Sequence, residues 1–496
     1  MNLTPTRPAF RELSRSRQHV PIAARLPLDA PVQALFEALD FGTPRILLES
    51  ARTHPVTGRY SIAVGRPSFK LTAKGSAIRI ARPDRVEALE GNPFLILEKL
   101  LASRRALRLP FLPPFVGGAV GFIGFDACRL LESLPSRAKD DLAMPDFGFL
   151  FCDEAVVVDH EEQALWVLTL APPGGQPDRA YDRAVGRIEE WVGRIAGTGT
   201  VRTFAAVQGP PAAGDRSWSD DERVLCTHSR ASFEAMVRRA KGFIADGEVY
   251  QANLSQRLSL RLSEEPWALY RQLTESNPSP FAAFADFGFL QIVSASPERL
   301  LRVSGGIAET RPIAGTRPRG GSAEETARLR RELILNEKER AEHLMLVDLE
   351  RNDLGRVCRY GSVRVDDLMA LEEYSHVIHI VSNVRGEPRP GTSLQDLLGA
   401  VFPGGTISGC PKIRCLQIID ALEPVRRQLY TGALGYVSFS GEMDFNLLIR
   451  TAFVHQGWVH VQAGAGIVAD SDPGREYEET LHKAQALLDV CLAETV

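Results

Sequence analysis

Residues 313–356 read IAGTRPRGGSAEETARLRRELILNEKERAEHLMLVDLERNDLGR, and the rest of the chain can be arranged around them. Residues 314–321 are rich in Gly and Pro, so we expect a loop there rather than a helix or a central strand. Ser322 followed by Glu325 forms a capping-box pattern, and the Ala-, Leu-, Glu- and Arg-rich segment behind it predicts a helix. Near the far end of this helix, Glu339 and Glu342 are spaced i, i+3, so both carboxylates project from one face.

A matching element lies near the C-terminus. Asp472 can cap a helix and Pro473 can occupy its first position. In this second helix Glu476, Glu479 and Lys483 share a face at i, i+3 and i+7. One glutamate pair alone is ordinarily part of a solvated helix face. Two such helices, each preceded by a loop of small residues, indicate a site for Mg²⁺ and an anionic substrate.

The composition is that of a soluble protein. The 496 residues are 44% hydrophobic and 24% charged, which allows a large core and about two domains. The net charge of −4 gives no reason to expect nucleic acid or a membrane as a partner, and no apolar run is long enough to span a bilayer. Seven cysteines without a C-x-x-C pair, and no secretory signal, predict a cytoplasmic protein with reduced thiols.

A change in composition divides the chain. Residues 196–222 are rich in Gly, Ala, Pro, Thr and Ser and cannot build a packed core, so they are predicted to be a linker. It separates an N-terminal domain (1–195) from a C-terminal domain (223–496). In the first domain we expect helices at 32–39, 93–104 and 179–195, and a hairpin from strands at 149–159 and 164–170.

Several polar residues stand at the ends of predicted strands. Glu49 and Ser50 end a strand that either leaves the core or borders a small-molecule pocket. Glu298 follows a strand pair at 281–294 and is either a loop charge or a catalytic acid. His379 lies in an apolar strand, where a hydrogen-bonded core histidine is the ordinary interpretation. The loop 402–412 opens a helix at 411–422 but lacks the spacing of a nucleotide-binding P-loop.

The remaining motifs indicate a site that binds an anion. A strand at 445–453 carries Arg450, whose guanidinium suits a carboxylate, and backbone amides of a Gly464–Gly466 loop can point at the same group. A single arginine on a strand is most often ion-paired at the surface. Arg450, Tyr430 and the small-residue loop together favour a dicarboxylate ligand.

At this point the sequence resembles the chorismate-utilising enzymes, in particular the large subunits of anthranilate synthase and aminodeoxychorismate synthase. The motifs that carry the resemblance are RPIAGTRPRG, EHLMLVDLERNDLGRV, YSHVIHIVS, PGGTISGCPKIR, IRT and QAGAGIVADSDP. The family implies a two-domain α/β fold of the α+β type. Its core is an orthogonal antiparallel β-sandwich flanked by helices, with the active site between the sheets.

The resemblance also implies roles for individual residues. Metal ligation would fall to Glu342 and Glu479, supported by Glu339 and Glu476, with Lys483 steadying the metal region. Chorismate would be bound by Gly315, Thr316, Tyr430, Arg450, Gly464, Ala465 and Gly466. Thr406 and His379 would border the ring near the departing hydroxyl, and Glu298 would be the general acid/base.

The implied reaction adds ammonia to the ring of chorismate with loss of the 4-hydroxyl and then expels pyruvate, and it depends on Mg²⁺. No amidotransferase nucleophile signature is found in this chain, so we expect ammonia from a glutamine amidotransferase subunit in a hetero-oligomer. A non-catalytic chorismate- or tryptophan-binding regulator is a further alternative, which would be expected to lack the metal carboxylates.

The choice of product rests on a few positions. Aminodeoxychorismate synthases typically carry a lysine where this chain has Ala314, and that amine attacks the ring; Ala314 therefore favours direct amination to anthranilate. Residues 250–256, 277–284 and 294–299 look more like the aminodeoxychorismate (para-aminobenzoate, folate) branch, which stays the alternative. The segment around Glu49 and Ser50 looks like the tryptophan site of anthranilate synthases, whose other wall would be Pro280, Phe281 and Ala282. At the last two positions the tryptophan-binding branch usually has Tyr-Met.

Overall fold

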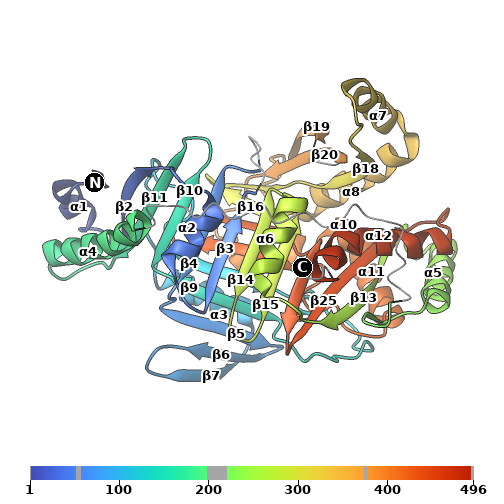
Figure 1. Cartoon of the computed structure of the whole chain (residues 1–496), viewed down its shortest axis with the longest axis horizontal. Helices are drawn as coiled ribbons and strands as arrows, with labels where there is room; N and C mark the ends of the chain where they lie inside the picture. Colours follow the sequence, from blue (N-terminus) through green and yellow to red (C-terminus); the bar gives the residue numbers. More distant parts are fainter. Residues whose placement is uncertain (1, 52–56, 198–220, 374–376, 493–496) are drawn as a thin grey trace.

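The computed structural model describes residues 2–51, 57–197, 221–373 and 377–492 (Figure 1). Helices and strands are mixed along the chain, and the pairings between its named strands are antiparallel. The strands gather in two large sheets. Apolar side chains of both sheets form one continuous core, with contacts such as Phe122 against Phe287 at 5.1 Å between ring centroids.

The first sheet has thirteen strands among the described residues. Its order is β1 (Asn2–Thr4), β2 (Val20–Pro27), β11 (Ala164–Ala171), β10 (Glu154–Asp159), β4 (Tyr60–Gly65), β3 (Arg45–Glu49), β14 (Phe281–Asp286), β15 (Gln291–Ser296), β24 (Thr451–His455), β25 (Trp458–Ile467), β13 (Gln251–Arg261) and β12 (Leu225–Cys226), with β21 (Gly409–Cys410) beside β13.

The second sheet has twelve strands within the same described ranges. Its order is β18 (Ile313–Pro318), β20 (Val377–Gly386), β17 (Ile307–Thr310), β16 (Arg299–Ser304), β23 (Met443–Leu447), β22 (Ala433–Ser438), β8 (Gly118–Ile123), β9 (Phe147–Cys152), β5 (Phe69–Lys74), β6 (Ala77–Ala81) and β7 (Val86–Glu90), with β19 (Arg364–Glu373) beside β20.

Helices surround the two sheets. They are α1 (Arg7–Leu13), α2 (Val32–Leu39), α3 (Pro93–Ala102), α4 (Pro177–Ala196), α5 (Arg230–Ala245), α6 (Pro266–Ser276), α7 (Ala323–Leu335), α8 (Glu337–Gly355), α9 (Leu394–Val401), α10 (Gly405–Ser408), α11 (Lys412–Leu422) and α12 (Pro473–Leu492), with a 3₁₀ turn at Phe125–Leu130. Helices α4, α6 and α12 pack on the first sheet, and α8 and α9 on the second. This arrangement confirms the predicted antiparallel β-sandwich flanked by helices.

Both sheets take strands from each side of the predicted linker. In the first sheet β3 pairs with β14, and in the second β8 pairs with β22. Helix α4 ends at Ala196, and most of the linker segment 196–222 lies outside the described residues. The domain limits 1–195 and 223–496 stay a prediction.

Local signals placed most of the helices correctly. Helix α2 has the expected bounds, and α12 begins where Asp472 Oδ1 accepts a hydrogen bond from the Arg475 amide at 2.9 Å. The hairpin β10–β11 is present, but residues 147–152 form β9 in the other sheet, so the predicted strand 149–159 is divided in two. No helix in the described part of the chain is both long enough and apolar enough to cross a bilayer.

The segment quoted first differs from its prediction in two ways. Residues 313–318 form the edge strand β18 instead of a loop, with a bulge at Gly315, whose φ of +65° suits glycine. An edge position tolerates proline because no partner needs its missing amide. The predicted single helix is broken at Asn336, whose side chain accepts from the Glu339 amide and so starts α8.

Two predictions near the C-terminus are wrong because strand pairing in the folded protein decides both structures. The strand expected at 445–453 is two strands in different sheets, and Arg450, at φ +51°, lies in the crossing between them. Residues 464–466 are not a loop but lie within β25, paired with residues 253–255 of β13.

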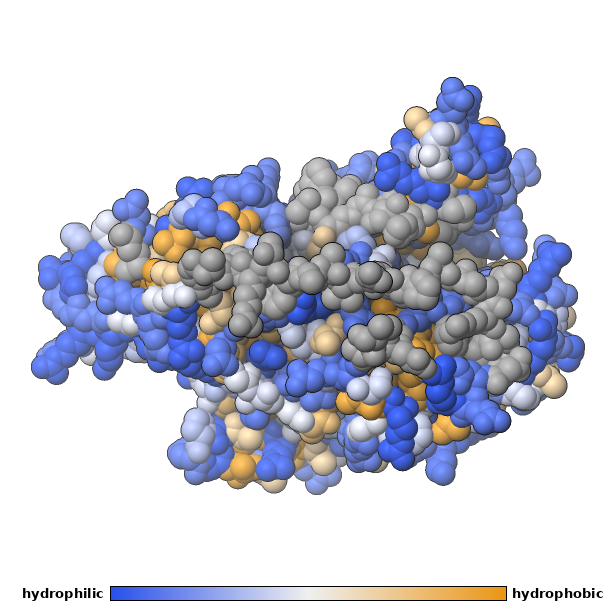
Figure 2. Space-filling view, in the orientation of Figure 1, coloured by the Kyte–Doolittle hydropathy of each residue, from blue (hydrophilic) through white to orange (hydrophobic). Residues whose placement is uncertain are grey.

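One end of the second sheet forms a distinct lobe. Strands β18, β19 and β20 with α7 project from the body at the upper right of Figure 1. The lobe has a small apolar cluster of its own, made by Leu329, Leu333, Ile378 and Ile380. Elsewhere on the visible face, hydrophilic side chains predominate and apolar ones occur in small groups (Figure 2).

Candidate active site

Four glutamates from two helices meet in space. Burial raises the pKa of Glu342, and the charges of Glu339, Glu476 and Glu479 raise it further, while Lys338 opposes them. The first pair lies on α8 and the second on α12, far away in sequence. The structure therefore brings together the acids that the sequence analysis predicted to share a metal. Their role in binding it remains a prediction.

Cations accompany these acids. Lys483 Nζ lies 2.6 Å from Glu479 Oε1 and donates to the Gly464 carbonyl at 3.0 Å. Lys338 Nζ lies 3.8 Å from Glu342, and Arg317 donates to Glu339 at 3.0 Å. Within the described ranges, no three His, Cys, Asp or Glu side chains are arranged as a ready metal centre. Burial and repulsion by neighbouring acids raise the pKa of Glu342 and of Glu476, and carboxylates of this kind fit a divalent cation because its charge relieves both effects.

Arg450 lies beside the acids with no carboxylate partner. Its guanidinium makes no salt bridge with any residue that the structure describes. Burial lowers the pKa of Arg450, while nearby Tyr430 and Glu479 raise it. Arg450 is half-buried, and a cation withdrawn from water without a counter-ion is costly unless a ligand supplies the charge. The planar guanidinium thus fits a substrate carboxylate.

The strand β25 contributes a glycine, Gly464, to the same site. A Cβ atom on Gly464 would lie 2.6 Å from Asn253 Oδ1 and 2.8 Å from the Tyr430 hydroxyl, so only glycine leaves room for these groups. Successive side chains alternate along a strand, so Ala465, which is fully buried, lies on the face opposite Gly464 and Gly466. Ala465 can therefore contribute only its backbone.

On the lobe, His379 and Gly315 face each other across β18 and β20. His379 Nδ1 lies 3.3 Å from the Gly315 carbonyl, so this nitrogen carries the proton and donates. Burial lowers the pKa of His379 to about 4, and Arg450 acts in the same direction. The imidazole is therefore neutral at physiological pH and lies near the unpaired arginine. Of Thr316, only the backbone belongs to the described structure.

Glu298 is the strongest acid/base candidate by its environment. It is only 5% exposed, and burial raises its pKa to about 7, against the opposing effects of the Thr406 hydroxyl and the Ile313 amide. Its carbonyl accepts from Leu447, and the Arg450 carbonyl accepts from Ala295. These backbone bonds hold the Glu298 turn along the crossing that carries Arg450. A carboxyl that titrates near 7 can give or take a proton at physiological pH.

The second predicted pocket is separate from these residues. A cavity of about 220 Å³ lies between the two sheets, and its walls include Glu49, Ser50, Pro280, Phe281 and Ala282. Tyr270 donates to Glu49 at 2.6 Å and Gln33 donates to it at 3.2 Å. Burial raises the pKa of Glu49. The structure thus brings all five predicted residues to one cavity.

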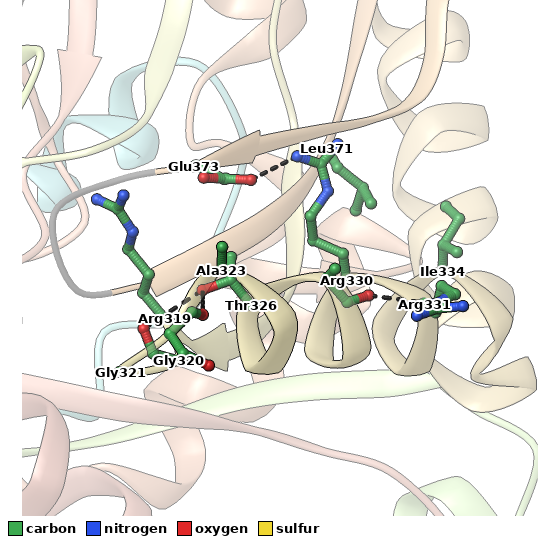
Figure 3. A pocket seen from close by; sticks show the side chains of 12 residues that line it. Arg319, Gly320, Gly321, Ala323, Thr326, Arg330, Arg331, Ile334, Leu371 and Glu373 are labelled. Carbon is green, nitrogen blue, oxygen red and sulfur yellow. Dashed lines mark hydrogen bonds and ion pairs between the residues drawn. The ribbon is translucent and has the colours of Figure 1, made fainter.

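Another hollow lies elsewhere. It measures about 940 Å³ and runs along α7 beside the end of β19, with Arg330 paired to Glu373 on its wall (Figure 3). None of the predicted site residues lines it. Size alone does not identify the functional site here.

A buried ion pair that was not predicted from the sequence supports the site. Arg427, 1% exposed, lies 2.7 Å from Glu423 and donates to the carbonyls of Asn253 and Ile407. It thereby ties α10, which carries Thr406, to the strand opposite Gly464. The i, i+4 spacing of Glu423 and Arg427 was the available signal, but that spacing is commonest on exposed helix faces.

Comparison with known proteins agrees with the motifs. A family profile described as chorismate binding enzyme matches residues 45–489. The chain is 42% identical over 466 residues to anthranilate synthase component 1 of Acetivibrio thermocellus, covering 93% of this chain and 92% of that protein. It is 43% identical over 443 residues to aminodeoxychorismate synthase component 1 of Bacillus subtilis, covering 89% and 90%.

A solved structure supports the fold. Anthranilate synthase component I from Streptococcus pneumoniae superimposes with a TM-score of 0.75 and 32% identity, covering 88% of this chain and 93% of that one. The fold predicted from the resemblance is thereby confirmed. With a profile that matches most of its length and relatives above 40% identity, the chain belongs to the chorismate-binding enzyme family.

Proposed function

We propose that this protein is the large subunit of a chorismate-aminating synthase that forms anthranilate and pyruvate. The observation that carries the proposal is the half-buried guanidinium of Arg450, which has no salt-bridge partner among the described residues and lies beside the acids of α8 and α12. Chorismate is a dicarboxylate, so it can bind Arg450 and, through a cation, these glutamates at the same time.

Magnesium would be held by Glu342 and Glu479, with Glu339 and Glu476 close by. When bound, the ion fixes the ring carboxylate and offsets developing negative charge. Lys483 would keep Glu479 oriented, since it already bridges that carboxylate and the Gly464 carbonyl. Tyr430 and the amides around Gly464 would complete the substrate cradle.

Glu298 would protonate the departing 4-hydroxyl. Its pKa near 7 allows a neutral carboxyl to be present at physiological pH, and the Thr406 hydroxyl lies beside it. Neutral His379 would border the ring as a hydrogen-bonding group and not as a cation. Attack by ammonia and loss of water then leave an intermediate from which pyruvate is expelled.

Ammonia would come from a glutamine amidotransferase subunit, so the working protein would be a hetero-oligomer. The names of the relatives, which call them component 1, support a second component. A cytoplasmic location belongs to the same proposal, because all seven cysteines are free thiols.

The choice of anthranilate rests on Ala314. In the aminodeoxychorismate branch, a lysine at this position supplies the ring nucleophile, and an alanine cannot. The runner-up is aminodeoxychorismate synthase, which is favoured by the 43% identity to the Bacillus subtilis protein.

The product of the purified chain decides between the two. Chorismate, Mg²⁺ and ammonium at alkaline pH should yield fluorescent anthranilate. A non-fluorescent product that a lyase converts to para-aminobenzoate would establish the runner-up. No turnover of chorismate would favour a non-catalytic chorismate-binding regulator.

The cavity at Glu49 is proposed to bind tryptophan as a feedback inhibitor. Its walls combine apolar side chains such as Leu48, Ile62 and Phe281 with polar groups from both sheets, which suits an amphipathic amino acid. Tryptophan should bind in calorimetry and reduce turnover, and the Glu49→Gln variant should weaken both effects. Absence of any heat of binding would remove this part of the proposal.

A further inference from the structure

Glu350 is a buried acid that the proposed reaction does not yet use. It lies on α8 two turns beyond Glu342 and is 8% exposed. Among the described residues it forms no salt bridge, and its Oε2 atom has no hydrogen-bond partner. The hydroxyl of Thr310 favours the charged form of Glu350, but Thr310 carries no charge of its own.

The charged groups that act on Glu350 cannot neutralise it. Glu298 and Asp353 are themselves acidic. Lys412 is the one cation among these groups, but its Nζ lies 2.6 Å from Asp353 and also donates to the carbonyls of Ala400 and Val401. A buried carboxylate without a counter-ion is so unfavourable that the group keeps its proton. Burial accordingly raises the pKa of Glu350 well above its ordinary range.

A neutral carboxylic acid has an O–H group to donate. The charge of Glu298 acts on Glu350, and Glu298 Oε1 is also buried without a partner in the described structure. When Glu298 gives its proton to the departing hydroxyl, it becomes a buried carboxylate and needs a donor. Hydrogen bonds to a charged group are the strong ones, and they can act directly or through one water molecule.

We infer that Glu350 is a positioning residue that stays protonated and donates a hydrogen bond to the Glu298 carboxylate formed during the reaction. The inference rests on the proposed role of Glu298 in chorismate amination. The C4–O bond breaks, the hydroxyl leaves as water with the proton of Glu298, and the ammonium group formed on the ring releases one proton to solvent. Glu350 keeps its own proton throughout, so it does not alter the proton balance of the reaction.

Two substitutions test whether Glu350 is a neutral hydrogen-bond donor to Glu298 or a charged neighbour of it. Glu350→Gln keeps a neutral donor, so the alkaline limb of kcat/KM, measured at constant free ammonia, should keep its midpoint. Glu350→Met removes the donor, so the midpoint should rise by about one unit and kcat should fall about tenfold. A lower midpoint in Glu350→Gln would mean that Glu350 was ionised, and an unmoved midpoint in Glu350→Met would mean that it donates nothing. Either result overturns the inference.

A measurement without substrate keeps the test independent of turnover and of the proposed function. Infrared spectra at pH 8.5 should contain the carbonyl band of a protonated carboxylic acid in the wild type. The band should persist in Glu298→Gln and disappear in Glu350→Gln. If the wild type lacks the band, Glu350 is ionised and the inference fails, even if the enzyme makes anthranilate. If the band is present but chorismate is not consumed, only the proposed function fails.

Discussion

Replacing Glu298 by glutamine should make the protein inactive but more stable at alkaline pH. Burial raises the pKa of this carboxyl from an ordinary value of 4.5 to about 7. Below pH 4.5 the group is neutral in both the folded and the unfolded chain, and its protonation does not affect stability. Between pH 4.5 and about pH 7, the unfolded chain loses the proton while the folded chain keeps it. The free energy of unfolding therefore falls as pH rises in this range.

The size of the effect follows from the shift. At about 1.4 kcal/mol per pKa unit, the wild type should lose about 3 kcal/mol of stability between pH 4.5 and pH 7 through this group, and the loss should then level off. Glu298→Gln cannot titrate and should avoid the loss. Urea unfolding followed by tryptophan fluorescence at half-unit steps from pH 5 to 8 measures the difference directly.

A matched control separates the site from general effects of charge. Glu189 is exposed in the middle of α4 and makes no ion pair with the described residues, so Glu189→Gln should follow the wild type at every pH. If the difference between Glu298→Gln and the wild type is constant from pH 5 to 8, Glu298 has an ordinary pKa. It would then be a poor general acid at physiological pH, and the reasoning would be refuted.

Three substitutions test other parts of the site. Glu479→Ala should lower kcat/KM in the anthranilate fluorescence assay by more than about 100-fold, because a metal ligand is lost; near wild-type activity would mean the metal is held elsewhere. Gly464→Ala would place a Cβ atom 2.6 Å from Asn253 Oδ1 and 2.8 Å from the Tyr430 hydroxyl, and should raise the KM for chorismate about tenfold with a smaller change in kcat. An unchanged KM would show that the cradle is not at β25. Ala314→Lys should divert part of the product to aminodeoxychorismate, detected by conversion to para-aminobenzoate; a product that remains purely anthranilate would contradict the role given to position 314.

Local sequence signals predicted the two acidic helices because each signal acts within one turn. Asp472 and Pro473 mark the start of α12, and the i, i+3 spacing places Glu476 and Glu479 on one face. That both helices then meet was an inference from matching patterns, and the structure brings the carboxylates within reach of one another.

Features that depend on the sheets were harder to predict. Arg450 lies where the chain passes from one sheet to the other, and an apolar stretch in sequence does not show such a crossing. Gly464 reads as a loop residue, whereas its small size matters because another strand and Tyr430 approach it. In the sequence, Glu350 is one of many charges on a helix, and only its burial distinguishes it.

The central claim is that Glu342 on α8 and Glu479 on α12 hold one divalent cation together with the substrate. Binding of Mn²⁺, a paramagnetic substitute for Mg²⁺, can be followed by electron paramagnetic resonance in the presence of chorismate and without ammonia. The wild type and Glu189→Gln should bind one equivalent, and Glu342→Gln and Glu479→Gln should each lose this binding. If both single variants bind Mn²⁺ as the wild type does, the two helices do not share a metal.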